Sequence, residues 1–156
     1  MFSGPLFVHH QESMEDTKEE KKKRKRPAIL VAEDDHDLRR ILSSAFRHEG
    51  YEVVEARDGV ELLDHLLYPP RFGDRVARFD LVLSDIRMPV LTGLDALACL
   101  RDSGSRIPMV LITAFGDHRT HLEAQRLGAS LVFNKPFDLQ ELKDAIHKLV
   151  PPPPAP

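Results

Sequence analysis

Two features are nearly missing from this sequence: cysteine and long apolar runs. Cys99 is the sole cysteine among 156 residues, which excludes an internal disulfide and a cluster of thiolate metal ligands. Its place in an apolar helical pattern predicts a buried, inert thiol. No run approaches the roughly 20 apolar residues of a membrane span, and the amino terminus lacks the basic start and apolar core of a signal peptide. We therefore expect a soluble, cytoplasmic protein with no membrane partner.

The length and composition suit one domain with a core. The chain has 156 residues, of which 42% are hydrophobic and 30% are charged. Its pattern predicts three parts: a disordered, basic-ended tail over residues 1–26, a folded domain over 27–150, and a proline-rich tail over 151–156. The fold is expected to end at Pro151 because the proline run to Pro154 cannot continue the preceding helical pattern.

The first tail ends in a basic run, Lys21-Lys22-Lys23-Arg24-Lys25-Arg26. Residues 1–26 hold seven basic and five acidic residues, whereas residues 27–156 hold 15 and 20. A block of like charges repels itself and is typical of a solvated segment. Because no aromatic residues are interleaved and the folded part is acidic, DNA is not an expected partner.

Apolar runs and helical repeats alternate along residues 27–150. Short strand-like runs lie at 28–32, 51–55, 79–85, 108–112 and 131–133, and most are apolar enough to be buried on both faces. Helical spacing of apolar residues predicts helices near 38–46, 58–67, 94–98, 117–127 and 138–149. Residues 71–78 are expected to form a loop. This alternation indicates an α/β fold with a parallel sheet and right-handed crossovers.

Four of the five strand patterns end in residues that suit one chemistry. The first is followed by Glu33 and Asp34, the central one ends in Asp85, the fourth in Thr113, and Lys135 comes just after the fifth. Parallel strands direct these ends to one edge of the sheet. Clustered carboxylates repel one another, and a hard cation with oxygen ligands, such as Mg²⁺, relieves that repulsion. A lysine and a threonine nearby suit an added anion. The set predicts a magnesium pocket that handles phosphate.

Four segments stand in order along the folded part: Ile29-Leu30-Val31-Ala32-Glu33-Asp34-Asp35, Asp80-Leu81-Val82-Leu83-Ser84-Asp85-Ile86-Arg87-Met88-Pro89, Leu111-Ile112-Thr113-Ala114 and Lys135-Pro136-Phe137. In this order and spacing, residues 28–149 resemble the receiver domain of two-component response regulators. The resemblance implies a flavodoxin-like, doubly wound five-stranded parallel sheet of order 2-1-3-4-5 with five helices. It also implies a stand-alone receiver that assists its own phosphorylation and dephosphorylation but is not an enzyme.

The same resemblance implies roles for the acidic residues. Asp85 would be the phosphoacceptor, taking a phosphoryl group from a histidine kinase or a phosphotransfer protein. Asp34, Asp85 and the backbone carbonyl of Arg87 would bind Mg²⁺ directly, with Glu33 acting through water. Glu33 stands where the family more often has aspartate, which is a conservative change. Phosphorylation would switch a protein-binding surface of this chain, and the downstream partner that binds this surface is an unknown protein.

The remaining implied residues handle the phosphoryl group. Thr113 and Ala114 would contact it, Lys135 would pair with it, and the Lys135–Pro136 peptide bond would be cis. Val132 stands where the family usually has a switch tyrosine or phenylalanine, so the usual coupling between threonine and aromatic is in doubt. Phe133 is expected on the opposite side of the strand because side chains alternate.

Two other functions fit parts of the pattern. A phosphorylation-independent receiver-like binding module would need no intact acidic pocket, and the full set of site residues argues against it. A magnesium-dependent phosphohydrolase of the haloacid-dehalogenase type would need a second aspartate two residues after the nucleophile. Arg87 occupies that position, so the enzyme signal is missing.

Overall fold

The computed structural model describes residues 26–114 and 118–155. Its centre is a five-stranded parallel sheet in the order β2-β1-β5-β6-β7, which is the predicted 2-1-3-4-5 order once the sheet's own strands are counted along the chain. The strands are β1 (Ala28–Ala32), β2 (Glu52–Ala56), β5 (Leu81–Asp85), β6 (Met109–Thr113) and β7 (Leu131–Asn134). Of the expected basic tail over residues 1–26, residues 1–25 lie outside the described residues.

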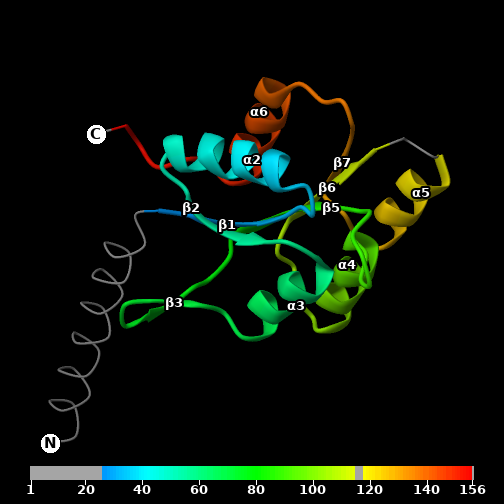
Figure 1. Ribbon diagram of the computed structural model, residues 1–156, viewed down its shortest axis with the longest axis horizontal. Coiled ribbons are helices and arrows are strands. Elements are labelled where there is room, and N and C mark those ends of the chain that lie inside the picture. Colours follow the sequence, from blue (N-terminus) through cyan, green and yellow to red (C-terminus); the bar gives the residue numbers. More distant parts are fainter. Residues whose placement is uncertain (1–25, 115–117, 156) are drawn as a thin grey trace, which may run out of the picture.

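Helices cover both faces of this sheet (Figure 1). The described residues form α2 (His36–His48), α3 (Gly59–Leu67), α4 (Gly93–Asp102), α5 (His118–Arg126) and α6 (Leu139–Leu149). Helices α2 and α6 lie on one face, and α3, α4 and α5 lie on the other. The predicted flavodoxin-like, doubly wound fold with five helices is therefore confirmed. None of these helices is long and apolar enough to cross a membrane.

The two central strands are buried because both faces of the sheet are covered. All five positions of β1 and all five of β5 are buried, and they pair in parallel with Val31 opposite Leu83. Alternate residues enter two separate cores. One core holds Leu30, Val82 and Leu111 with Leu62 and Leu97, and the other holds Ile29, Leu83 and Ile112 with Phe46 and Ile146.

Side-chain caps set where the helices begin. Asp35, Asp58 and Asp138 each accept a hydrogen bond from a backbone N–H three residues later, at the starts of α2, α3 and α6. Thr92 and Asp95 form a reciprocal capping box at the start of α4. These caps fix the turns that leave the carboxyl edge of the sheet, where the candidate site residues stand.

Some local predictions were wrong. The second strand runs from Glu52 to Ala56 and the fourth from Met109 to Thr113, each one residue later than predicted. Residues 71–78 contain a small hairpin, with β3 (Arg71–Phe72) paired antiparallel to β4 (Arg75–Val76), instead of a loop. Arg75 anchors the hairpin through an ion pair with Glu52 at 2.5 Å. Cys99 is exposed rather than buried, because Ala96, Leu97 and Leu100 take the inner face of α4.

The proline-rich segment, described as far as residue 155, packs against the turn after α2 through Pro153, and Val150 before it also contacts this turn. The Tyr51 hydroxyl donates to the Val150 carbonyl at 2.6 Å. Pro153 lies against Gly50, where an added Cβ would come within 2.6 Å of the proline ring. Gly50 also has a φ of 98°, a left-handed conformation that favours glycine. Both features explain why a glycine ends the turn after α2.

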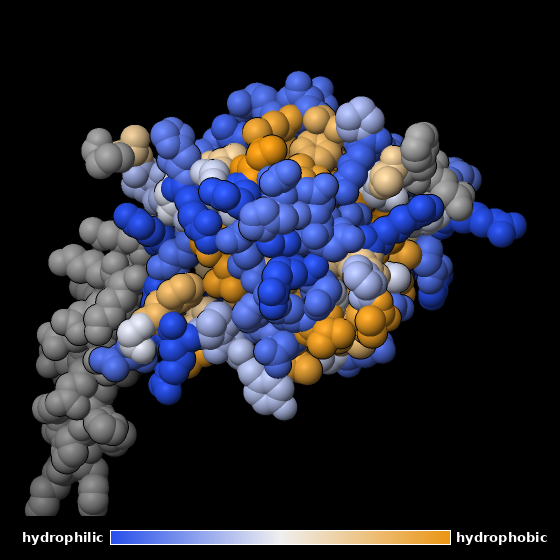
Figure 2. All heavy atoms as spheres, viewed as in Figure 1, coloured by the Kyte–Doolittle hydropathy of each residue, from blue (hydrophilic) through white to orange (hydrophobic). Residues whose placement is uncertain are grey.

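The face seen in Figure 2 is mostly hydrophilic, with hydrophobic residues showing over α3 and α4 at the lower right. On α3, Val60 and Leu67 are exposed. Scattered exposed apolar residues of this kind are normal on a folded protein.

Candidate functional site

Asp85 ends the central strand β5 and lies at the carboxyl edge of the sheet. Although it is charged, it is only 5% exposed. The Ser84 hydroxyl donates to the Asp85 carbonyl at 2.9 Å, and the Arg87 N–H donates to Asp85 Oδ1 at 3.2 Å. Gly93 passes so close that an added Cβ would lie 2.4 Å from the Asp85 carbonyl oxygen. The backbone around Asp85 is therefore held tightly.

Two more acids reach the same place from the end of β1. Glu33 is 1% exposed, whereas Asp34 is exposed. Carboxylate oxygens of Glu33, Asp34 and Asp85 lie within 4.8 Å of one another. Asp35, the third acid of this run, is instead the N-cap of α2, and its hydrogen bond from the Leu38 N–H lowers its pKa. The structure thus brings together the three predicted acids and leaves the fourth in a capping role.

Lys135 approaches these acids from the end of β7. Its Nζ lies 2.7 Å from Glu33 Oε1 and 2.9 Å from Asp85 Oδ2. Its backbone N–H donates to the Thr113 carbonyl at 2.7 Å, which ties the ends of β6 and β7 together. The Lys135–Pro136 peptide bond is cis, as expected from the resemblance. One ammonium group therefore bridges two carboxylates from strands far apart in sequence.

Burial and charge shift the pKa values of this cluster. Burial raises the pKa of the Glu33 carboxyl to about 8; the neighbouring Asp85 also raises it, while Lys135 opposes the shift. Burial lowers the pKa of the Lys135 ammonium, but its hydrogen bonds to Glu33 and Asp85 outweigh that effect and raise the pKa overall. With Asp34, three acids face one base, and a further cation would offset the repulsion between carboxylates that contributes to the raised pKa of Glu33.

Comparison with known proteins decides the family. Residues 29–147 match the response regulator receiver domain. The chain is 32% identical over 123 residues to sporulation initiation phosphotransferase F of Bacillus subtilis, covering 79% of this chain and 93% of that protein. The chain belongs to the response regulator receiver family.

The receiver is also similar to parts of longer regulators and to solved structures. It is 42% identical over 120 residues to the regulatory protein AtoC of Escherichia coli, covering 77% of this chain and 24% of that protein. Receiver protein TrrA of Thermotoga maritima, solved in complex with Mg²⁺-BeF, has a TM-score of 0.67 and 30% identity over 80% of this chain and 99% of its own. Chemotaxis response regulator CheY4 of Vibrio cholerae has a TM-score of 0.69 and 27% identity, covering 80% of this chain and 99% of that one.

The acidic pocket of this receiver fits a magnesium ion. Glu33, Asp34 and Asp85 each offer it a carboxylate oxygen, the kind of donor that Mg²⁺ prefers. Glu33 Oε2 is buried, and no hydrogen bond to it is found within the part of the chain that the structure describes. A buried polar atom without a partner is costly, and a cation with its waters would satisfy it. Receiver domains bind Mg²⁺ at such a pocket.

The residues expected to contact a phosphoryl group lie at the ends of β6 and β7. Thr113 is 2% exposed at the end of β6, and Ala114 follows it half-buried. Val132 packs with the core beneath α3 and α4, whereas Phe133 packs with the core beneath α2 and α6. The expected opposite placement of these neighbours is confirmed.

Sequence reasoning missed Arg39 of α2. Its guanidinium contacts the loop of residues 33–35 after β1, called here the acidic loop. Arg39 is 7% exposed, and its NH1 donates to the Glu33 carbonyl at 2.8 Å. A charged residue within the inward stripe of an amphipathic helix was the available signal. The helical pattern of Leu38, Leu42 and Phe46 places residue 39 near that stripe.

Proposed function

We propose that this receiver accepts a phosphoryl group on Asp85 from a histidine kinase or a phosphotransfer protein. Asp34, Asp85 and the Arg87 carbonyl would bind Mg²⁺, with Glu33 acting through water. When bound, the ion supplies positive charge that offsets the negative charge of the transferring phosphoryl oxygens. Receiver domains interact with such donors.

The proposed reaction is a nucleophilic transfer. A carboxylate oxygen of Asp85 attacks the phosphorus, and a new O–P bond forms as the bond from phosphorus to the donor's imidazole nitrogen breaks. The bonding electron pair leaves with the imidazole nitrogen, and a proton on the other ring nitrogen makes the leaving group a neutral imidazole. With a small acyl-phosphate donor, the P–O bond breaks and a carboxylate leaves. The chain itself is the acceptor and is not an enzyme acting on a separate substrate.

The observation that carries this proposal is the position of Lys135 between Glu33 and Asp85. An ammonium group there neutralises part of the acidic pocket and stands ready to pair with a phosphoryl group on Asp85. Thr113 ends β6 beside β7 and Ala114 follows it, and they would supply a hydroxyl and a backbone N–H to the same group. These roles combine the geometry with the family resemblance.

The binding consequence of phosphorylation belongs to the same proposal. We infer that residues 27–150 form the switching unit and that a phosphoryl group changes its affinity for a downstream protein. The chain spans 93% of the Bacillus phosphotransferase but only 24% of AtoC and 46% of the uncharacterized regulator YkoG of Bacillus subtilis. The outputs of those longer regulators are therefore not assigned to this chain.

Intact mass measurement tests the proposal directly. The full chain is incubated with acetyl phosphate and magnesium, and one phosphoryl group should be added. Asp85→Asn should show no added mass. Asp35→Asn is the matched control. Asp35 caps α2, so the chain should still gain a phosphoryl group when Asp35 is replaced. Phosphorylation that persists in Asp85→Asn would refute the assignment.

A further inference from the structure

Arg39 is a buried cation that ends beside the acidic loop. Its side chain is 8% exposed. Taking a charged group out of water costs several kcal/mol unless partners compensate it. A lysine or arginine on the inner side of α2 therefore calls for an explanation, since an apolar residue would pack there at no such cost.

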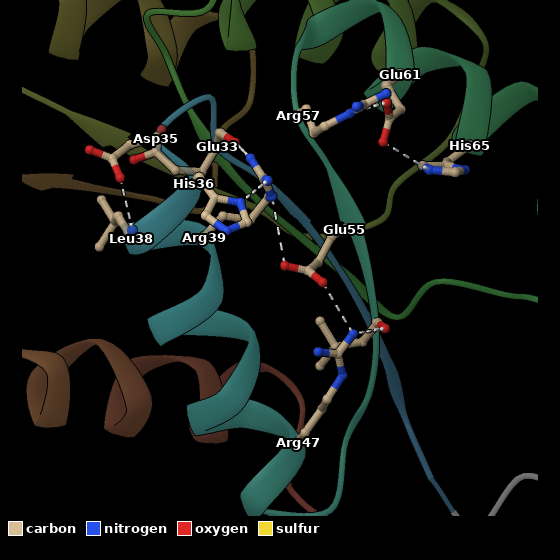
Figure 3. Close-up of polar contacts among 11 residues, drawn as sticks. Glu33, Asp35, His36, Leu38, Arg39, Arg47, Glu55, Arg57, Glu61 and His65 are labelled. Atoms are coloured by element: carbon tan, nitrogen blue, oxygen red, sulfur yellow. Dashed lines mark hydrogen bonds and ion pairs between the residues drawn. The ribbon is translucent and has the colours of Figure 1, made fainter.

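The partners of Arg39 come from three segments. NH1 donates to the Glu33 carbonyl at 2.8 Å, NH2 lies 3.0 Å from His36 Nδ1, and Nε lies 3.7 Å from Glu55 Oε1. Figure 3 shows the guanidinium between the Glu33 end of β1, the first turn of α2 and β2. Because the guanidinium is planar and rigid, it fixes the relative positions of these three segments.

The contact with Glu33 has a specific place in the chain. The accepting carbonyl belongs to the peptide that joins Glu33 to Asp34, between the two acids that enter the pocket from β1. On its other side, the Glu33 N–H donates to the Ala56 carbonyl of β2 at 3.1 Å. The backbone is thus held before and after Glu33, and a rotation of the Glu33–Asp34 peptide would break the bond to Arg39.

Glu55 holds the guanidinium in turn. Its second carboxylate oxygen lies 3.5 Å from Arg47 NH2, and Arg47 also donates to the Val53 carbonyl at 3.1 Å. These contacts form a chain from Arg47 through Glu55 and Arg39 to the Glu33 carbonyl (Figure 3). Arg47 is 50% exposed and does not contact the acidic loop. It is therefore a natural control for Arg39.

We propose that Arg39 is a positioning residue for the metal pocket: its guanidinium holds the Glu33–Asp34 peptide so that both carboxylates converge on Asp85. This inference rests on the proposed function, because it requires a magnesium ion at these acids. Arg39 does not touch the ion. Its effect is on the entropy and geometry of the ligands, since ligands held in place bind a metal more tightly than ligands that must be ordered on binding.

Calorimetric titration of the full chain with MgCl₂, well below the unfolding temperature of each variant, tests the proposal. Arg39→Met and Arg39→Lys should weaken magnesium binding by about 10- to 100-fold, the range typical for residues that orient metal ligands. Lysine should fail to rescue because one ammonium cannot reach the Glu33 carbonyl and Glu55 in the geometry of the planar fork. Glu55→Gln should give a smaller loss, and Arg47→Met less than about a twofold change by the same reasoning.

A second measurement separates positioning from general destabilisation. The rate of phosphorylation by acetyl phosphate is followed against magnesium concentration. In Arg39→Lys, the magnesium concentration for half-maximal rate should rise while the rate at saturation stays near that of the wild type. If Arg39→Met does not fold, Arg39→Lys and Glu55→Gln decide the matter.

The outcomes distinguish this inference from the proposed function. If folded Arg39→Lys and Glu55→Gln bind magnesium as tightly as the wild type does, this inference is overturned and the proposed function is not. An equal loss in Arg47→Met also overturns it, because the loss would then not depend on the contact between Arg39 and the Glu33 carbonyl. A wild-type chain that neither binds magnesium nor gains a phosphoryl group overturns the proposed function and this inference together.

Discussion

The two halves of the site edge are built differently. Glu33 and Asp34 follow β1, and Asp85 ends β5; all ten positions of these two strands are buried. The buried residues of α2, which cover the strands, are Arg39, Leu42, Ser43 and Phe46. Lys135 follows β7, where Leu131 and Asn134 are exposed, and Ala124 is the sole buried residue of α5 within its described span. The acidic half is therefore densely packed, whereas the half formed by β7 and α5, next to Lys135, is loosely covered.

This difference suits a switch. A pocket that must attract a cation and align a nucleophile needs fixed positions before the reaction. Residues that respond to the new phosphoryl group need an alternative arrangement of low free-energy cost, which loosely packed segments provide. The contrast between the halves leads to four predictions.

The largest contrast should appear in stability. Leu83→Ala in β5 should lower the free energy of unfolding by about 2–5 kcal/mol, because Leu83 is fully buried between two layers. Leu131→Ala in β7 should cost less than about 1 kcal/mol, because that side chain is 38% exposed. Urea unfolding of both variants measures the difference. Equal losses would show that the two halves are equally packed.

Two glycines sharpen the comparison at the backbone. Gly93→Ala should destabilise the fold by about 1–3 kcal/mol and slow phosphorylation, because the new methyl group would press on the Asp85 carbonyl. Gly73→Ala in the hairpin meets no atom within 4 Å, and its φ of 63° should cost about 1–2 kcal/mol. Its rate of phosphorylation by acetyl phosphate should equal that of the wild type. If Gly73→Ala were also phosphorylated slowly, the slow phosphorylation of Gly93→Ala could not be assigned to its pressure on Asp85.

The acidic half should also respond to pH and magnesium. The pKa of Glu33 is about 8 in the fold and has an ordinary value of 4.5, so the folded state binds a proton more tightly than the unfolded state. Without metal, this contribution to stability is complete below pH 4.5 and is lost as pH rises through about 8. Thermal unfolding across this range should show the loss, and Glu33→Gln should flatten it.

Magnesium should then raise the unfolding temperature near neutral pH, because it binds the folded pocket. Asp34→Asn should reduce this increment more than Glu33→Gln does, since Asp34 is the proposed direct ligand. A wild-type unfolding temperature that does not change during a millimolar magnesium titration would argue against an assembled pocket.

The smallest effect concerns the loosely covered half. With beryllofluoride as an acyl-phosphate mimic, hydrogen exchange should change most in α5 and little at residues 131–133. Val132 is β-branched and too small to swing between two positions as a switch aromatic does. The loop after Ala114 belongs to the same prediction, although residues 115–117 lie outside the described residues. A Val132→Tyr variant with a larger response would confirm that the missing aromatic weakens the switch.

The sequence predicted features that depend on local patterns. Apolar runs located the five strands, and acids directly after them located the pocket, because strand ends of a parallel sheet meet at one edge. Cys99 was placed wrongly because it lies between the inward positions Leu97 and Leu100, where the helix turns away from the core. The hairpin was missed because strands of two residues have no period to detect.

Arg39 was beyond local reasoning for another reason. Its partners are the Glu33 carbonyl and the Glu55 side chain, and the contact with Glu55 depends on β2 pairing beside β1. The position of Arg39 near the inward stripe of α2 indicates burial, but its partners cannot be named until that pairing is known. Ile41 shows the converse, since it fits the apolar pattern but is 55% exposed.

The packing of residues 150–153 against Gly50 and Tyr51 gives the protein a built-in optical probe. The chain has two tyrosines and no tryptophan. Tyr68 is 74% exposed, whereas Tyr51 is buried, stacks on His147 with ring centroids 6.2 Å apart, and donates its hydroxyl to Val150. Burial raises the pKa of Tyr51 to about 12. In a Tyr68→Phe variant, the intrinsic ultraviolet emission would come from one phenol, and alkaline titration of that emission would report release of the proline segment.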